Sequence, residues 1–207
     1  MGKTVVSAAL LHRYRLVSTL RYWKPVQTGI EQDDDTAEVV RLAGLTPEQV
    51  LNAGVRLPRP LPPHLSAALA SAPISLPPLM DLAWSQPESA RFIVEGAGGV
   101  LVPLNEHELM VDLIAVLGLT VVIAARSGLG TINHTLLTIE ALRNRAAAIG
   151  GVVMVGEPNP DNRIAIETRG AVTVLGTVPP LNPLTPAALQ ASALTLDPTS
   201  ELEPFFL

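Results

Sequence analysis

Short apolar runs alternate along this chain with segments in which apolar residues recur at the spacing of a helix. The runs are rich in β-branched residues and poor in charge, as is typical of strands buried on both faces. Strands are predicted at residues 17–23, 91–95, 120–125, 152–155 and 172–175. Helices are predicted at residues 4–14, 35–43, 65–70, 79–85, 110–117, 132–145, 160–169 and 187–193. The alternation predicts parallel βαβ units, and therefore an α/β fold with a mostly parallel sheet and helices on both faces.

Proline, glycine and acidic residues set several of these boundaries. Lys24-Pro25 ends the first strand, because proline cannot donate a hydrogen bond within a sheet and disfavours helix before it. Asp35 opens the next helix, and Glu38 follows it at the spacing of a capping box, so Asp35 is a candidate N-cap. Gly44 ends that helix.

Composition and charge narrow the function classes. We expect a single domain over residues 1–207, since this length supports a sizeable core. The net charge is −5 and no basic stripe is present, so we expect no nucleic-acid partner. The chain has no cysteine, which excludes disulfides, thiolate metal sites and thiol nucleophiles. No apolar run reaches the roughly 18 residues of a membrane span. Because Lys3 and Arg13 interrupt any signal-peptide core, we expect a cytoplasmic protein without a membrane partner.

Unusual polar and glycine residues follow the predicted strands. Lys24 follows the first strand and Glu95-Gly96 the second, while residues 127–130 and 156–157 follow two later ones. Ligands of parallel sheets bind outside the carboxyl ends of the strands, so we expect these groups to converge on one edge. The glycines within residues 96–99 favour binding, since they let the backbone approach a ligand closely.

Each of these residues also has an ordinary structural interpretation. Lys24 could be a surface lysine, Glu95 a solvated strand end, and Asp35 only a helix cap. Residues 128–133 could be a plain turn, although a helix N-terminus also binds carboxylates and phosphates. Thr4, Asp35 and Glu95 together would supply the oxygen ligands that Mg²⁺ prefers.

Gly2-Lys3-Thr4 matches the end of a phosphate-binding loop, whose full motif is G-x-x-x-x-G-K-[ST] between a strand and a helix. The helical pattern that should follow is present from Val5 onward, whereas the preceding strand and first glycine are not part of the sequence. Either the match is accidental or the chain has lost its beginning.

Six segments, in this order, resemble the dethiobiotin synthetase family. They are residues 2–4 (GKT), 22–29 (YWKPVQTG), 63–64 (PH), 94–99 (VEGAGG), 128–134 (GLGTINH) and 175–179 (LGTVP). The resemblance covers nearly the whole chain. It implies a P-loop NTPase-like three-layer α/β/α domain that acts as a cytoplasmic homodimer with Mg²⁺ as cofactor and ATP as co-substrate.

The resemblance also implies a reaction, the ATP-dependent conversion of 7,8-diaminononanoate and CO₂ to dethiobiotin, ADP and phosphate in biotin biosynthesis. One substrate amine takes up CO₂ as a carbamate, and ATP phosphorylates the carbamate to a mixed anhydride. The second amine then closes the ring and expels phosphate. Positioning and charge neutralisation account for most of such catalysis.

Roles for individual residues follow from the same resemblance. Lys3 and Lys24 would be the catalytic lysines, and Thr4, Asp35 and Glu95 would bind the metal ion. The ATP site would comprise Gly2, Lys3, Thr4, Val5, Asp35, Glu95, Gly96, Ala97, Gly98, Val155, Gly156 and Pro179. The substrate site would comprise Thr28, Gly130, Thr131, Ile132 and Asn133, with residues 130–133 contributed by the second subunit.

Two departures from the family pattern have structural consequences. Without the strand that precedes the phosphate-binding loop, the sheet should lack a central strand and most phosphate-binding amides. Val155-Gly156 stands where some relatives have Asn-Asp, so adenine would be recognised by backbone groups there and near Pro179.

Two alternatives stay open. The first is another P-loop ligase or ATPase, such as a cobyrinate amidation relative or a partition-type ATPase. The second is not an enzyme but an inactive or truncated paralogue that serves as a dimeric binding module.

Overall fold

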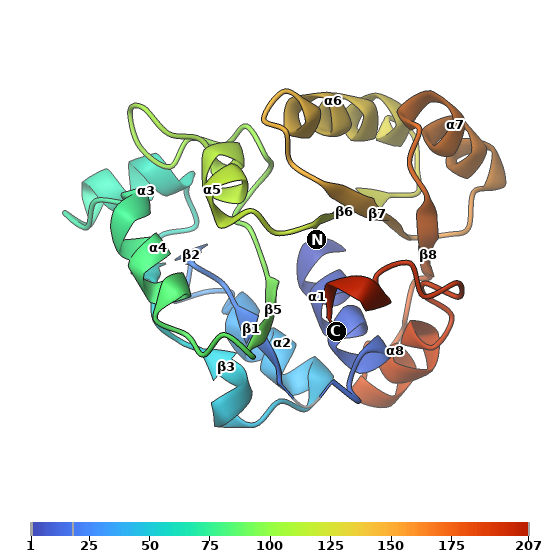
Figure 1. Ribbon diagram of the computed structural model, residues 1–207, viewed down its shortest axis with the longest axis horizontal. Coiled ribbons are helices and arrows are strands. Elements are labelled where there is room, and N and C mark those ends of the chain that lie inside the picture. The colour runs from blue at the N-terminus through green and yellow to red at the C-terminus, as the bar shows by residue number, and fades with distance from the viewer. Residues whose placement is uncertain (1, 18, 207) are drawn as a thin grey trace.

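The computed structural model describes residues 2–17 and 19–206, in which parallel strands are surrounded by helices (Figure 1). The strands are β1 (Leu20–Trp23), β2 (Val26–Thr28), β3 (Val50–Leu51), β4 (Val55–Leu57), β5 (Arg91–Val94), β6 (Val121–Arg126), β7 (Ile149–Val155) and β8 (Val174–Val178). The helices are α1 (Gly2–Arg13), α2 (Asp35–Ala43), α3 (Pro63–Leu69), α4 (Leu76–Trp84), α5 (Met110–Leu117), α6 (Thr131–Arg143), α7 (Pro160–Gly170) and α8 (Pro186–Ala193), with 3₁₀ turns at Pro47–Gln49 and Glu203–Phe205.

The strands form two parallel three-stranded sheets, ordered β3-β1-β5 and β6-β7-β8, and a small parallel pair, β2-β4. Helices α6 and α7 cover one face of β6-β7-β8, and α1 and α8 cover the other (Figure 1). Parallel strands need such crossover helices, which bury both faces of the sheet. The predicted α/β fold with helices on both faces is therefore confirmed.

Three buried apolar clusters lie between the layers. The first joins α1, α2 and α8 to β1, β7 and β8. The second joins α3, α4 and α5 to β1 and β4, and the third joins α6 and α7 to β6, β7 and β8. Successive side chains of β1 enter different clusters, since Tyr22 belongs to the first and Trp23 to the second. This alternation follows from the two-residue period of a strand.

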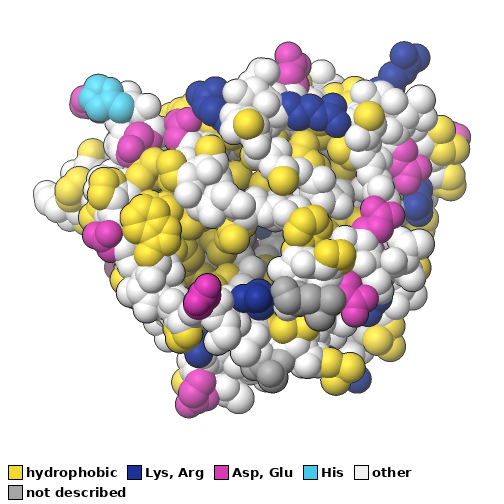
Figure 2. All heavy atoms as spheres, viewed as in Figure 1, with side chains coloured by type: hydrophobic (Ala, Val, Ile, Leu, Met, Phe, Trp, Pro, Cys, Tyr) yellow, Lys and Arg dark blue, Asp and Glu magenta, His cyan; other side chains and the backbone are white. Residues whose placement is uncertain are grey.

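The two three-stranded sheets are separated by a cavity of about 320 Å³. Within the described part of the chain, β5 pairs only with β1, and β6 pairs only with β7. Their other edges face the cavity, whose walls are mostly apolar and include Phe92, Leu113 and Ile123. Figure 2 shows hydrophobic side chains gathered over α4 and α5, where Trp84 and Val116 are exposed. The described three-stranded sheets are therefore not joined to each other by strand pairing.

Element boundaries were harder to predict than element types. The first strand was predicted to begin at residue 17 but begins at Leu20, because a turn follows α1. Strands β2, β3 and β4 were missed, since each is only two or three residues long and shows no periodicity. No described helix is long and apolar enough to cross a bilayer.

Candidate active site at the carboxyl ends of the strands

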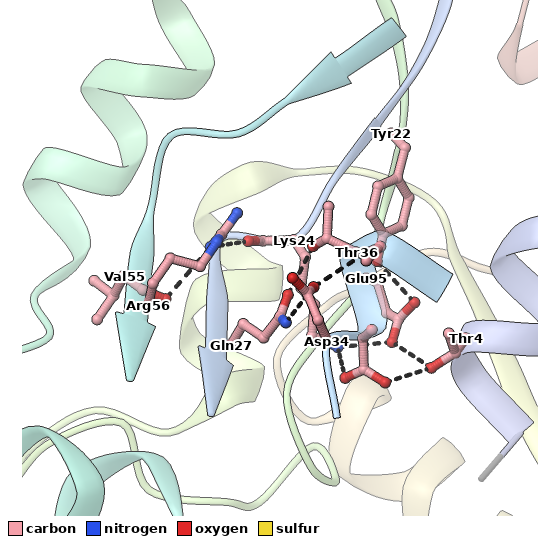
Figure 3. A network of polar contacts seen from close by, with 11 residues as sticks. Thr4, Tyr22, Lys24, Gln27, Asp34, Thr36, Val55, Arg56 and Glu95 are labelled. Carbon is pink, nitrogen blue, oxygen red and sulfur yellow. Dashed lines mark hydrogen bonds and ion pairs between the residues drawn. The ribbon is translucent and has the colours of Figure 1, made fainter. Parts of the chain in front are cut away.

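Four of the predicted site residues meet in one polar cluster (Figure 3). The Lys24 ammonium lies between two carboxylates, with Nζ 2.8 Å from Asp35 Oδ2 and 2.7 Å from Glu95 Oε1. The Thr4 hydroxyl contacts the same two groups, at 2.9 Å from Asp35 Oδ1 and 3.2 Å from Glu95 Oε1. The cluster therefore brings together residues that are up to 91 positions apart in the sequence.

Each member of the cluster comes from the end of a different element. Lys24 directly follows β1, and Glu95 directly follows β5. The two strands are parallel neighbours, and the Glu95 N–H donates to the Trp23 carbonyl at 2.8 Å. Thr4 lies in the first turn of α1, and Asp35 begins α2. Strand ends and helix N-termini thus converge, as the parallel topology requires.

Lys24 and Glu95 are each only 3% exposed, so the interpretations of Lys24 as a surface lysine and of Glu95 as a solvated strand end are wrong. A buried charge is tolerated when it is paired and hydrogen-bonded. Lys24 has two carboxylate partners, and Glu95 accepts hydrogen bonds on both oxygens.

The N-cap of α2 is Asp34, not Asp35. The Asp34 carboxylate accepts a hydrogen bond from the Ala37 N–H at 3.0 Å, and the Gln27 side chain donates to the same carboxylate oxygen at 2.8 Å. The Thr36 hydroxyl in turn donates to Gln27 at 2.7 Å (Figure 3). Because Asp34 satisfies the helix end, the Asp35 side chain is free to face Lys24 and Thr4.

Sequence reasoning missed Tyr22, whose hydroxyl donates to Glu95 Oε2 at 3.0 Å. Tyr22 and Lys24 lie two positions apart along one extended segment, so their side chains point to the same face. That spacing is a signal that could have identified Tyr22 once Lys24 was a candidate.

Burial and neighbouring charges shift several pKa values in the cluster. Burial lowers the pKa of Lys3 and the charge of Lys24 lowers it further, although Glu95 and Asp35 oppose them. Burial alone would raise the pKa of Asp35, but the hydrogen bond and charge of Lys24 outweigh it and lower that pKa. Burial and the charge of Glu95 raise the pKa of Tyr22, which keeps its hydroxyl protonated and able to donate.

Residues 96–98, which follow Glu95, pack closely against neighbouring side chains. Gly98 has a φ of +67°, and a Cβ there would lie 2.8 Å from Val102 Cγ2. Ala97 is buried in the second apolar cluster, and Gly96 lies against Met110. The segment therefore requires glycine at position 98 for both conformation and space.

The remaining candidates form a second group around β6 and β7. Gly156, with a φ of +126°, follows β7, and a Cβ there would lie 2.4 Å from the Ser127 Oγ. Gly130 is the N-cap of α6 with a φ of +88°, and Pro179 follows β8. In the α6 segment Thr131 is buried, Ile132 half-buried and Asn133 exposed.

The two groups approach each other at the start of α1. A Cβ on Gly2 would lie 3.1 Å from Val155 Cγ2, so the first turn of α1 touches the end of β7. Val5 packs at the edge of the first apolar cluster. Thr28 ends β2 and is half-buried. Between the described residues no hydrogen bond or ion pair joins positions 130–133 or Thr28 to Lys24, Asp35 or Glu95.

The described residues hold no group of three or more histidine, cysteine, aspartate or glutamate side chains placed for a metal ion. The candidate set is of another kind, with two carboxylates and one hydroxyl. The Thr4 hydroxyl is within 3.2 Å of both carboxylates, so three oxygen donors are close together. Hard cations such as Mg²⁺ are bound by oxygen donors, often through only one or two carboxylates. The residues present fit such an ion.

Comparison with known proteins identifies the family. An AAA domain family (AAA_26) matches residues 1–188. The chain is 44% identical over 193 residues to an ATP-dependent dethiobiotin synthetase BioD of Agrobacterium fabrum, covering 91% of this chain and 85% of the relative. It is 46% identical over 189 residues to the protein of that name from Paramagnetospirillum magneticum, covering 91% and 87%. It is 47% identical over 184 residues to a biotin biosynthesis bifunctional protein BioCD of Bordetella avium, covering 88% of this chain and 38% of that protein.

Proposed function

The chain belongs to the ATP-dependent dethiobiotin synthetase family, and from this premise we propose that it joins CO₂ to 7,8-diaminononanoate and closes the ring, using ATP, in the cytoplasm. The observation that carries the assignment of the active site is the convergence of Thr4, Lys24, Asp35 and Glu95 from four separate elements. A chance G-K-T sequence would not place its threonine against two carboxylates and beside a buried lysine.

Mg²⁺ would be held by Thr4, Asp35 and Glu95, and it would supply charge neutralisation for the phosphate oxygens of ATP. All three side chains present oxygen atoms, and Thr4 bridges the two carboxylates. Buried Lys24 contacts both carboxylates, and Tyr22 donates to the second oxygen of Glu95.

The two lysines would neutralise the anions of the reaction. Lys3 lies in the first turn of α1 and lines the end of the cavity near Glu95 and Gly96. Among the described residues Lys3 has no ion-pair partner, so its amino group is available to a phosphate oxygen. Lys24 is held beside the same place by Asp35 and Glu95 and would stabilise the carbamate and the phosphate transferred to it.

The substrate and the adenine base would bind at the ends of β2, β6, β7 and β8. Thr28 would donate a hydrogen bond near the carbamate. Residues 130–133 would bind the substrate carboxylate at the N-terminus of α6, as part of a homodimer. The Thr131 N–H donates to the Gly128 carbonyl, whereas among the described backbone groups Ile132 and Asn133 have N–H groups without a backbone acceptor. Backbone groups of Val155, Gly156 and Pro179 would contact the adenine.

The test is direct production of dethiobiotin. The protein is incubated with 7,8-diaminononanoate, bicarbonate and MgATP, and the product is measured by mass spectrometry. Lys24→Met should abolish product, whereas Arg145→Met, at an exposed ion pair with Asp112, should retain it. A folded parent protein that forms no product would refute the proposed function.

One observation favours the second candidate, a nucleotide-free binding module. The edges of β5 and β6 that face the cavity are unpaired within the described chain, and the cavity walls are mostly apolar. The same assay separates the two functions, because a binding module forms no product whichever lysine is present.

A further inference from the structure

Tyr22 is held on both sides by its neighbouring strands. It lies in β1, the central strand, where it pairs in register with Val50 of β3 and with Ile93 of β5. Its side chain is completely buried, in the apolar cluster that joins β1 to α1 and α2. Because the strand is hydrogen-bonded on both sides and the ring is packed, the hydroxyl has a fixed place.

That hydroxyl reaches one particular atom of the candidate site. It donates to Glu95 Oε2 at 3.0 Å, while Glu95 Oε1 accepts from Lys24 at 2.7 Å and from Thr4 at 3.2 Å. The Glu95 backbone is also anchored to β1, through its N–H and the Trp23 carbonyl. Glu95 is therefore held at both ends by consecutive residues of the same strand.

The hydroxyl restricts the orientation of the carboxylate. The two carboxylate oxygens are equivalent acceptors, so a half-turn about the last side-chain bond exchanges them and leaves the same hydrogen bonds in place. In any orientation between these two, the buried Tyr22 hydroxyl would lose its Glu95 acceptor. The plane of the carboxylate is therefore held with one oxygen toward Thr4 and Lys24 and the other toward Tyr22.

We propose that Tyr22 is a positioning residue that fixes the plane of the Glu95 carboxylate, with one oxygen directed at the metal and phosphate side of the site. The proposal rests on the proposed role of Glu95 as a ligand of Mg²⁺. Partners that orient a metal ligand typically change metal affinity by about 10–100-fold when they are removed. Phenylalanine at position 22 would fill the same space without the hydroxyl, so its effect isolates the hydrogen bond.

The chain contains a matched control. Tyr14, the other of the two tyrosines, is also buried, and its hydroxyl also donates to a carboxylate, that of Asp197. This pair joins α1 to the C-terminal segment and has no contact with Glu95 among the described side chains. Tyr14→Phe removes the same kind of hydrogen bond, and therefore a similar amount of stability, away from the site.

The experiment measures Mn²⁺ affinity by electron paramagnetic resonance, with a non-hydrolysable ATP analogue present. Tyr22→Phe should weaken Mn²⁺ binding about tenfold, and Tyr14→Phe should change it by less than about twofold because the sites are separate. Glu95→Gln should weaken binding at least as much as Tyr22→Phe, and the double variant should be no weaker than Glu95→Gln alone. Thermal midpoints without metal show whether the two tyrosine variants lose comparable stability.

The outcomes distinguish the proposed metal-ligand role of Glu95 from the positioning role of Tyr22. If Glu95→Gln leaves Mn²⁺ affinity unchanged, Glu95 is not a ligand, and both the metal assignment and the role of Tyr22 are overturned. If Glu95→Gln weakens binding but Tyr22→Phe behaves like Tyr14→Phe, the metal assignment holds and the positioning role is overturned.

A measurement on the parent protein covers the case in which Tyr22→Phe does not fold. The chain has two tyrosines, so Tyr14→Phe assigns both hydroxyl signals in a protein labelled with ¹³C at tyrosine Cζ. The Tyr22 signal should persist, protected from exchange, when Mg²⁺ and the ATP analogue are added. Loss of that protection on addition would show that the hydrogen bond is absent from the loaded site and would overturn the proposal.

Discussion

Replacing Lys24 by methionine should destabilise the protein far more than replacing an exposed lysine or arginine. Methionine is unbranched like lysine but one atom shorter, and it lacks the ammonium group with its charge and hydrogen bonds. The ammonium is 3% exposed and lies within 2.8 Å of both Asp35 and Glu95. Without it, two carboxylates face each other across the Thr4 hydroxyl with no cation between them.

The expected loss of unfolding free energy in Lys24→Met follows from the burial of Asp35 and Glu95. Removing one member of a buried ion pair typically costs about 3–5 kcal/mol, because the other charge is left uncompensated. Glu95 is as buried as Lys24, whereas the Asp35 side chain is 30% exposed, so we expect the lower end, about 3 kcal/mol. For a chain of this size that corresponds to a fall in the thermal midpoint of roughly 6–12 °C.

The assay is urea denaturation at neutral pH without Mg²⁺, with Arg145→Met as the control. Arg145 pairs with Asp112 at 2.9 Å, a distance like those of Lys24, but its side chain is 45% exposed. Exposed pairs contribute only about 0–1 kcal/mol. Adding Glu95→Gln to Lys24→Met should restore part of the lost stability, since it removes one of the two facing charges. A loss in Lys24→Met no larger than that of the control would refute the reasoning.

Three further substitutions test how residues around the site and on α5 contribute to stability. Asp34→Ala should cost about 1 kcal/mol in urea denaturation because it removes the N-cap of α2, whereas Asp34→Asn should keep most of that energy. Gly98→Ala should destabilise by about 1 kcal/mol or more, since its φ is +67° and a Cβ would meet a valine at 2.8 Å, while Gly99→Ala, with no neighbour within 4 Å, should not. Two hydrogen bonds, the stronger from a backbone N–H, lower the pKa of Asp112, so its stabilising effect is present above the unfolded pKa and lost in acid. The stability difference between the parent and Asp112→Asn should therefore shrink as the pH falls below about 4.

Much of the fold could be predicted because its signals are local. The limits of α5 were predicted as the structure has them, at Met110–Leu117, because an apolar helical pattern ends at Gly118, which adopts the left-handed conformation. Strand β7 was predicted from a continuous apolar run, as buried parallel strands require. The short strands β2 and β4 carry no such signal, since their pairing with each other, rather than their own sequence, makes them strands.

Some features of the candidate site could likewise be predicted from the sequence, and others could not. Glu95 with its following glycines was identifiable from sequence, and so was Lys24 before its proline. Their mutual contact followed from a general rule about the carboxyl ends of parallel strands. The choice between Asp34 and Asp35 as the helix cap did not follow, because it depends on Gln27, whose side chain reaches Asp34 from strand β2. Adjacent aspartates are equivalent in sequence until a neighbour distinguishes them.

The contact between Tyr22 and Glu95 shows what kind of information was missing. Tyr22 is opposite Ile93 in the β1–β5 ladder, and Glu95 lies two positions beyond Ile93, on the same face, where the Tyr22 hydroxyl reaches it. A shift of one residue in that register would turn every side chain of β1 to the other face. Tyr22 would then enter the cluster of α3, α4 and α5, and Trp23, whose indole N–H donates to the Ala53 carbonyl, would face Glu95 instead. The register is set by the pairing of two strands about seventy residues apart, together with the burial of both faces, so no local pattern specifies it. The orientation of the Glu95 carboxylate is therefore a property of the sheet.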